Sequence, residues 1–218
     1  MKIYTFFAEA QKFMYENYFL PSLPRDCEAH STIHSEPYVD FGVAPFGERT
    51  RSKLHFMAQA CKENFGEIIV FSDADVQFFG PIKKILIEEL DDFDIACQQG
   101  GIFTYFSLCP GFFVCKCNDM TLKLFDNMKK FFRIDDQFSL NEQKWICKYK
   151  CLSPTRFFTI GQVLYLNNKS KSKRWQEGID FMVPETILMH HASGVVTLEK
   201  KLKLLDVVKM KVNNKQWG

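Results

Sequence analysis

Short apolar stretches along the first half of the chain have the length and character of β-strands. The run Ile68-Ile69-Val70-Phe71 is the most strongly apolar of them. A continuous run of this kind is typical of a strand that is covered on both faces of its sheet. The predicted strands in this half are Lys2–Ala8, His30–Val39, Glu67–Ser72 and Asp94–Gln98.

Between these strands, apolar residues recur at the spacing of amphipathic helices. Leu54, Met57, Ala58 and Cys61 are the clearest example, and Gly66 supplies a stop signal after them. The predicted helices are Gln11–Leu20, which Pro21 should end, Glu48–Asn64, Pro81–Leu90, Met120–Phe132 and Glu199–Val208. Alternating strands and helices predict an α/β fold with a mostly parallel sheet flanked by helices.

The length and composition of the chain fit one globular domain. It has 218 residues, of which 46% are hydrophobic and 25% are charged. A net charge of +2 at pH 7 is too small for a dedicated nucleic-acid-binding protein. The unusual feature is the presence of 23 phenylalanines, which indicate either an aromatic core or an aromatic-lined cleft for a small molecule.

The sequence gives no sign of a transmembrane segment or an export signal. No stretch approaches the roughly 20 apolar residues that cross a bilayer, and Glu9 and Lys12 make the N-terminus too polar for a signal peptide. We therefore expect a cytoplasmic protein whose eight cysteines are reduced thiols. The alternative is a zinc site on Cys115, Cys117, Cys147 and Cys151, although Cys-x-Cys spacing is atypical for zinc.

Two aspartates, Asp73 and Asp75, follow the most apolar predicted strand and are separated by Ala74. In open α/β sheets, ligands bind beyond the carboxyl ends of the strands. Two carboxylates brought together there repel each other unless a positive group shares the site. A divalent Mg²⁺ or Mn²⁺ suits this role, because such cations take carboxylate oxygens and leave positions free for phosphates. The other interpretation is a polar loop whose aspartates cap the next helix.

The segment Glu67–Pro81 resembles the Asp-x-Asp strand end of nucleotide-diphospho-sugar glycosyltransferases with the GT-A fold. Other segments resemble further motifs of that family, in the family's order: Phe93–Gln98, Cys109–Val114, Asp135–Gln137 with Leu140-Asn141, and Met189–Gly194 with Lys200-Lys201. Because the matches extend from about residue 1 to residue 210, the resemblance implies a single Rossmann-like GT-A domain over residues 1–218. Residues 1–100 would form its nucleotide-binding half and residues 101–218 its acceptor-binding half.

The resemblance also implies roles at the metal and the donor. Asp75 should bind the cation, Asp73 should lie near the ribose or a metal-bound water, and His191 should complete the metal shell. Because His190 precedes His191, the histidine ligand is ambiguous by one residue. Imidazole together with carboxylates suits Mn²⁺ better than Mg²⁺. The residues expected around the nucleotide and its sugar are Thr5, Phe6, Phe7, Lys53, Asp73, Ala74 and Lys201.

On the acceptor side, the resemblance implies contacts from Gln98, Gln99, Gly111, Phe112, Asp135 and Gln137. The amides of the two adjacent glutamines suit sugar hydroxyls, because they donate and accept at once. If the reaction inverts the anomeric centre, Asp136 is the expected general base, since the like charge of Asp135 beside it would raise a pKa. A retaining reaction needs no such base, and the two aspartates could simply cap a helix that starts near Phe138.

The implied function is metal-dependent transfer of a sugar from a nucleoside-diphosphate donor to a hydroxyl of a glycan or glycoprotein. Family habit favours a UDP-sugar over a GDP-sugar. One alternative is a haloacid-dehalogenase-like phosphatase with Asp73 as nucleophile and Asp75 as acid/base, but its motif normally ends the first strand. Another is a non-catalytic module that binds sugar nucleotides. Ser193 departs from the family, which more often has Asn at this position.

Overall fold

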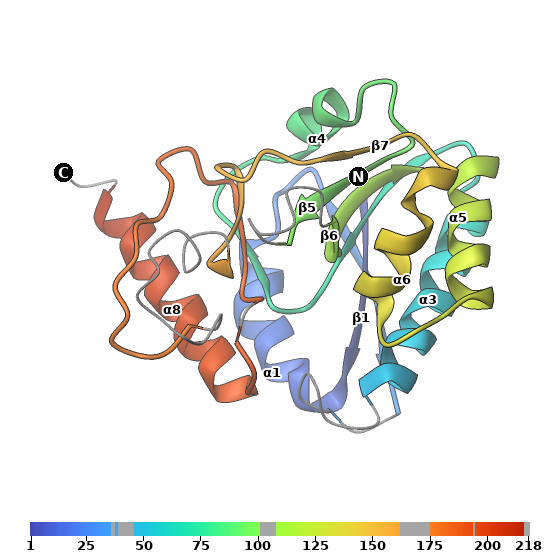
Figure 1. The fold of residues 1–218 in the computed structure, drawn as a ribbon. Helices are drawn as coiled ribbons and strands as arrows, with labels where there is room; N and C mark the ends of the chain where they lie inside the picture. Colours follow the sequence, from blue (N-terminus) through green and yellow to red (C-terminus); the bar gives the residue numbers. More distant parts are fainter. Residues whose placement is uncertain (36–37, 39–45, 101–107, 162–174, 194, 216–218) are drawn as a thin grey trace.

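The computed structural model describes residues 1–35, 38, 46–100, 108–161, 175–193 and 195–215 (Figure 1). Its centre is a sheet with the strand order β2-β1-β3-β6-β5-β7. These strands are β1 (Lys2–Ala8), β2 (Glu28–His34), β3 (Ile68–Ser72), β5 (Ile95–Gln99), β6 (Leu108–Lys116) and β7 (Tyr149–Cys151). Only β6 runs antiparallel to its neighbours in this described sheet. The predicted mixed, mostly parallel α/β fold is confirmed.

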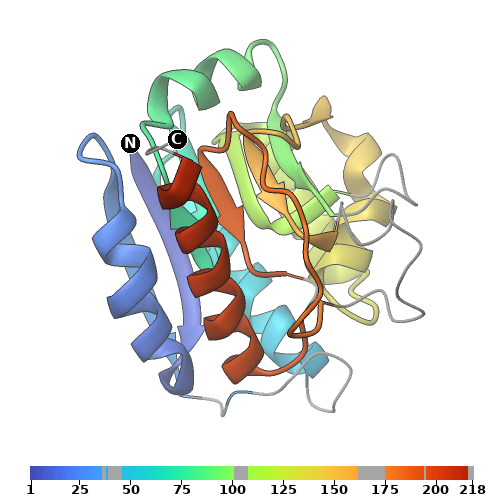
Figure 2. The same ribbon diagram turned by 90° about the vertical axis from the view of Figure 1, so that its left-hand side faces the viewer.

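Helices cover both sides of this sheet. The helices α3 (Phe46–Glu63), α5 (Asp119–Lys130) and α6 (Asp136–Gln143) lie on one side (Figure 1). The N-terminal helical segment, residues 9–22, and α8 (Leu198–Lys215) lie on the other side, next to each other (Figure 2). The Tyr18 hydroxyl donates to Asp206 of α8 at 2.9 Å, which ties these two helices together. A further helix, α4 (Lys83–Leu90), precedes β5.

A second, smaller sheet brings distant parts of the chain together. It has the order β4-β9-β8, with β4 (Val76–Phe78), β9 (Met189–His191) and β8 (Phe157–Thr159). Strand β4 begins directly after Asp75 and pairs antiparallel with β9, so that Val76 lies opposite His191. This pairing fixes the place of the C-terminal histidines relative to the Asp-x-Asp turn.

The N-terminal helical segment corrects one prediction, because it continues past Pro21 to Ser22. A wide π turn over Tyr15–Phe19 interrupts the helix and ends two residues before the proline. In a regular α-helix the proline ring would meet the carbonyl four residues earlier. The wider turn accommodates the ring, and the helix ends one residue beyond it.

The phenylalanines build the core on both faces of the central sheet. Neighbouring residues of a strand point to opposite faces, so Phe113 packs against α3 and α5 while Phe112 packs towards β4 and β8. The phenylalanines that are at most 2% exposed are Phe7, Phe19, Phe71, Phe112, Phe113, Phe125, Phe157 and Phe158. The aromatic excess is therefore mainly core. None of the described helices is long and apolar enough to cross a membrane.

Candidate functional site

Three predicted metal ligands, Asp73, Asp75 and His191, lie together at the carboxyl end of β3. The histidine Nε2 is 3.3 Å from Asp75 Oδ1 and 3.8 Å from Asp73 Oδ2. One ligand atom from each residue lies within 4.8 Å of the others. Backbone hydrogen bonds hold the turn: the amide of Asp73 donates to Gly111 at 2.7 Å, and that of Ala192 donates to Asp75 at 2.9 Å. The sheet pairing thus aims all three side chains at one point.

The strand geometry distinguishes the two adjacent histidines. Because successive residues of a strand point to opposite faces, only His191 of β9 faces the carboxylates. The His190 ring points the other way, is completely buried, and lies 3.5 Å from Gln77. Burial and the neighbouring His191 lower the pKa of His190 to about 3, so this ring is neutral. We therefore assign the candidate ligand to His191.

Two lysines share the carboxylates with the histidine. The Lys201 ammonium lies 2.5 Å from Asp75 Oδ2, and Lys53 lies 2.6 Å from Asp73 Oδ1. Lys53 also lies 3.0 Å from Asp136 Oδ2, and so links the Asp-x-Asp turn to the start of α6. The ion pairs raise the pKa of each lysine although burial opposes this. Both lysines are therefore charged near neutral pH.

The electrostatics of Asp75 and His191 follow from this arrangement. Burial alone would raise the pKa of Asp75, but Lys201 and His191 hold it well below its usual value. Burial likewise disfavours an imidazolium, yet the Asp75 carboxylate raises the pKa of His191 to about 10. In the metal-free protein, positive charges on lysine and histidine therefore compensate the aspartates. A ligand that brings its own positive charge competes with them.

The donor set fits a hard divalent cation. Two carboxylates and one imidazole converge within bonding reach of a single ion, and carboxylate oxygens with imidazole suit Mn²⁺. Among the described residues, no other group of three histidine, cysteine or acidic side chains meets the same distance criterion. The alternative zinc site on cysteines gains no support, and all eight cysteines are free thiols.

Gln98 lies beside the site, but it does not have the position expected of a residue that contacts sugar hydroxyls. Its side chain is completely buried. The amide Nε2 donates to the carbonyls of Phe157 and Phe158 at 3.3 and 3.2 Å, and Oε1 lies 2.7 Å from His191 Nδ1. Because both ends of the amide are engaged inside the protein, neither is left for a sugar. The neighbouring Gln99 is half-buried at the end of β5.

Two aromatic expectations are also corrected. Phe7 stacks on Tyr15 with ring centroids 4.5 Å apart, and Phe112 stacks on Phe157 at 5.7 Å. Both rings are buried in the core and do not face the site, because they lie on the covered face of their strands. Phe6 is half-buried and stacks on His34 at 4.9 Å.

Of the other donor-side residues, Thr5 and Ala74 are buried side chains next to the metal-ligand turn. Thr5 pairs with Ser72 in the sheet, and its hydroxyl is buried without a hydrogen-bond partner. Ala74 packs in the core, so only its backbone is placed to meet a ligand. Lys53 and Lys201 contact the Asp-x-Asp turn directly.

The acceptor-side aspartates begin α6. Asp135 is its N-cap and accepts from the Phe138 amide at 2.7 Å, as the capping interpretation predicted. Burial, followed by the charge of Asp136, raises the pKa of Asp135. Ile134, just before it, has a φ of 60°, a strained conformation for a β-branched residue. Gln137 is half-buried in the first turn of α6.

The Lys53–Asp136 ion pair and the contact between Gln98 and His191 were not predicted. No local sequence pattern indicates either contact, because the partners are far apart in the chain and the fold brings them together. Ser193, which replaces the family's more frequent Asn, has its hydroxyl hydrogen-bonded to that of Thr159.

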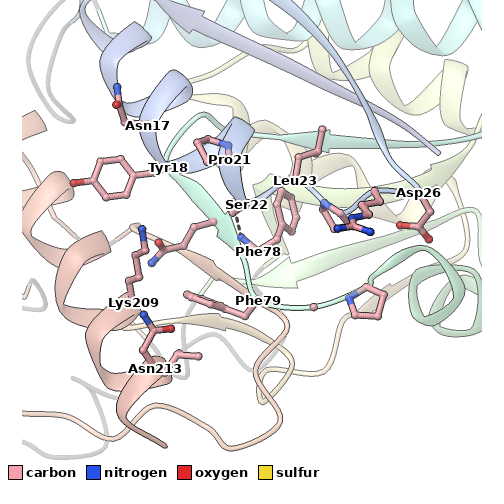
Figure 3. A pocket seen from close by; sticks show the side chains of 16 residues that line it. Asn17, Tyr18, Pro21, Ser22, Leu23, Asp26, Phe78, Phe79, Lys209 and Asn213 are labelled. Atoms are coloured by element: carbon pink, nitrogen blue, oxygen red, sulfur yellow. Dashed lines mark hydrogen bonds between the residues drawn. The ribbon is translucent and has the colours of Figure 1, made fainter. Parts of the chain in front are cut away.

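A cavity of about 670 Å³ lies apart from this cluster (Figure 3). It is lined by the N-terminal helical segment, the end of β4 and the C-terminal part of α8, with Tyr18, Phe78 and Phe79 in its wall. None of the residues predicted for the metal, donor or acceptor lines it.

Gly111 leaves the space that His191 occupies. A Cβ atom at this position would collide with the His191 ring and lie 2.8 Å from Asp73 Oδ2. We predict that Gly111→Ala displaces the histidine and weakens Mn²⁺ binding by at least about tenfold, a size typical of disturbed metal-ligand orientation. Titration calorimetry measures the affinity. Gly161→Ala is the control, because its added Cβ would have no neighbour closer than 3.6 Å. Unchanged Mn²⁺ affinity in Gly111→Ala would contradict this assignment.

No protein-family model matches the sequence, and no curated protein is significantly similar to it. Solved structures do match. A glycosyltransferase involved in glycosylation of the major capsid of PBCV-1 superposes with a TM-score of 0.61 and 10% identity, covering 94% of this chain and all of that one. The glycosyltransferase GlyE of Streptococcus pneumoniae TIGR4 superposes with a TM-score of 0.58 and 14% sequence identity. This superposition covers 94% of this chain and 60% of that one.

The galactosyltransferase LgtC gives a TM-score of 0.56 with 10% identity, and the superposition covers 95% of this chain and 96% of that one. At such low identities these matches establish the architecture. The resemblance inferred from the sequence motifs is confirmed at this level: the chain has the fold of the GT-A glycosyltransferases.

Proposed function

We propose that this protein is a metal-dependent glycosyltransferase that moves a sugar from a nucleoside-diphosphate donor to an acceptor hydroxyl. The observation that carries the proposal is the convergence of Asp73, Asp75 and His191 at the carboxyl end of β3. The GT-A fold supports it, since the likeness extends over nearly the whole chain. A divalent cation held by these residues would neutralise the diphosphate leaving group.

The two lysines would act on the donor once a cation takes over the carboxylates. Lys201 starts 2.5 Å from Asp75 and lies in the first turn of α8, so a change of rotamer would bring its ammonium to a phosphate oxygen. Lys53 lies between Asp73 and Asp136, where it would hold both carboxylates in place beside the donor sugar. The half-buried Phe6 would offer its ring to the nucleotide base.

Asp136 would serve as general base in an inverting reaction. It is buried and is joined to the candidate metal site through Lys53 at 3.0 Å. A base must lie within hydrogen-bond reach of the hydroxyl that it deprotonates. An acceptor placed over the start of α6, near Asp135 and Gln137, would meet this condition. A retaining reaction would not use Asp136 in this way.

The donor and acceptor follow from the sequence resemblance. A UDP-sugar is favoured over a GDP-sugar, Mn²⁺ over Mg²⁺, and the acceptor is a glycan or glycoprotein. Residues 1–100 would form the nucleotide-binding half and residues 101–218 the acceptor-binding half. The phosphatase alternative has no supporting observation: Asp73, its nucleophile, is paired with Lys53 and follows the third strand along the chain.

The first test is a thermal-shift panel of UDP, UDP-glucose, UDP-galactose and GDP-mannose, each with and without Mn²⁺. A ligand at about 100 times its Kd stabilises a protein by about 2.7 kcal/mol, which is a shift of several degrees. We predict a shift that requires both nucleotide and Mn²⁺ and that is absent in Asp75→Asn. Asp92→Asn, at an exposed position, is the matched control and should show the same thermal shift as the wild type.

Asp75→Asn leaves Lys201 and His191 without their buried counter-charge, which costs about 3–5 kcal/mol in other proteins. Each variant is therefore compared with its own ligand-free melting temperature. The proposal is wrong if no nucleotide stabilises the wild type in a metal-dependent way, or if Asp75→Asn keeps the full shift.

The second test concerns Asp136. With a donor identified by the panel, we predict that Asp136→Asn lowers transfer to the acceptor by about 10²–10⁴-fold, the usual contribution of a general base. The rise in melting temperature that the nucleotide causes in the presence of Mn²⁺ should persist in this variant. Asp119→Asn removes an acidic residue from the first turn of α5 and should leave the transfer rate unchanged. Full transfer by Asp136→Asn would exclude this residue as the base.

A further inference from the structure

Gln98 is held in one orientation by its surroundings. Its Nε2 donates to the main-chain carbonyls of Phe157 and Phe158 at 3.3 and 3.2 Å. Carbonyl oxygens only accept hydrogen bonds, so the NH₂ end of the amide must face them. The Oε1 end consequently faces His191, at 2.7 Å from Nδ1. The strand also changes register between Cys97 and Gln98, and such bulges redirect a side chain.

This contact fixes a proton on Nδ1 of His191. Because Gln98 Oε1 can only accept, Nδ1 must be the donor in this hydrogen bond. The opposite nitrogen, Nε2, then points at the carboxylates of Asp75 and Asp73, at 3.3 and 3.8 Å. An imidazole that ligates a metal through one nitrogen usually donates its other N–H to a fixed acceptor.

We propose that Gln98 is a positioning residue: it holds the Nδ1 proton of His191 and fixes the plane of the ring, so that Nε2 is the nitrogen presented to a divalent cation between Asp73 and Asp75. This inference rests on the proposed metal-dependent function. Gln98 touches neither the metal nor the donor in this role, since it acts through the histidine.

An uncharged hydrogen-bond acceptor such as the Gln98 amide suits this position beside His191. The aspartates Asp73, Asp75 and Asp136 already bring three carboxylates to the cluster, against the ammonium groups of Lys53 and Lys201. A further buried carboxylate would need another positive partner. Glutamine orients the histidine without adding charge, and its amide also supplies donors for two buried carbonyls.

The chain provides a matched control. Gln77 is also buried, also donates to a main-chain carbonyl, that of Leu205 at 2.9 Å, and also lies beside a histidine, His190. That histidine does not face the carboxylates. Gln77→Met and Gln98→Met therefore remove the same chemical group from similar surroundings, and only Gln98→Met removes the acceptor of the candidate metal ligand.

The experiment measures Mn²⁺ binding to the full chain without nucleotide, by titration monitored with electron paramagnetic resonance. Electron spin-echo envelope modulation on the bound ion then detects ¹⁴N coupling from a ligating imidazole. We expect the wild type and Gln77→Met to bind Mn²⁺ with ¹⁴N coupling. Gln98→Met should bind about 10–100-fold more weakly and lose this coupling.

Three outcomes overturn the inference. If folded Gln98→Met binds Mn²⁺ as tightly as the wild type and with the same ¹⁴N coupling, Gln98 does not position His191, while the proposed function stands. If Gln98→Met does not fold, ¹⁵N NMR of the Mg²⁺-loaded wild type decides, and a His191 proton on Nε2 instead of Nδ1 is contrary to the inference. If the wild type binds no Mn²⁺, with or without UDP, the metal-dependent function fails as well.

Discussion

The structure around the Asp-x-Asp turn depends on the neutralisation of one buried carboxylate. Asp75 is only 1% exposed, and an unpaired charge at such a position would be costly by several kcal/mol. The fold supplies Lys201 and His191 as its partners, and Lys53 in the same way for Asp73 and Asp136. These partners come from α3, β9 and α8, so the charges bring residues 53–75 together with residues 191–201 at the carboxyl end of the sheet.

This arrangement links metal binding to the position of the basic side chains. A cation bound by the carboxylates would replace the positive charge that Lys201 and His191 supply in the metal-free protein. Lys201 would then be available for a phosphate, and His191 would have to lose its Nε2 proton to coordinate. The same side chains would thus compensate the carboxylates without a cation and contribute to binding when it is present.

The sequence was sufficient for the architecture and for locating the two aspartates of the candidate metal site, because these depend on local signals. Apolar runs located β3 and β5, helical periodicity located α3, and the doublet Asp73–Asp75 marked the end of the buried strand. The choice between His190 and His191 needed the alternation of β9, which no local pattern reveals. Phe7, Phe112 and Gln98 were expected to contact ligands, yet sheet pairing buries all three. The role of Gly111 depends on a neighbour 80 positions away in the sequence, His191.

We propose that Asp73, Asp75 and His191 together hold one divalent cation while Lys201 turns to the donor diphosphate. The most direct measurement is an anomalous difference map, recorded at the manganese absorption edge, from crystals grown with Mn²⁺ and UDP. We predict one strong peak bonded to an Asp75 carboxylate oxygen and His191 Nε2, with the Lys201 ammonium next to a phosphate oxygen. A peak elsewhere, or an unbroken Lys201–Asp75 ion pair beside bound UDP, would contradict it.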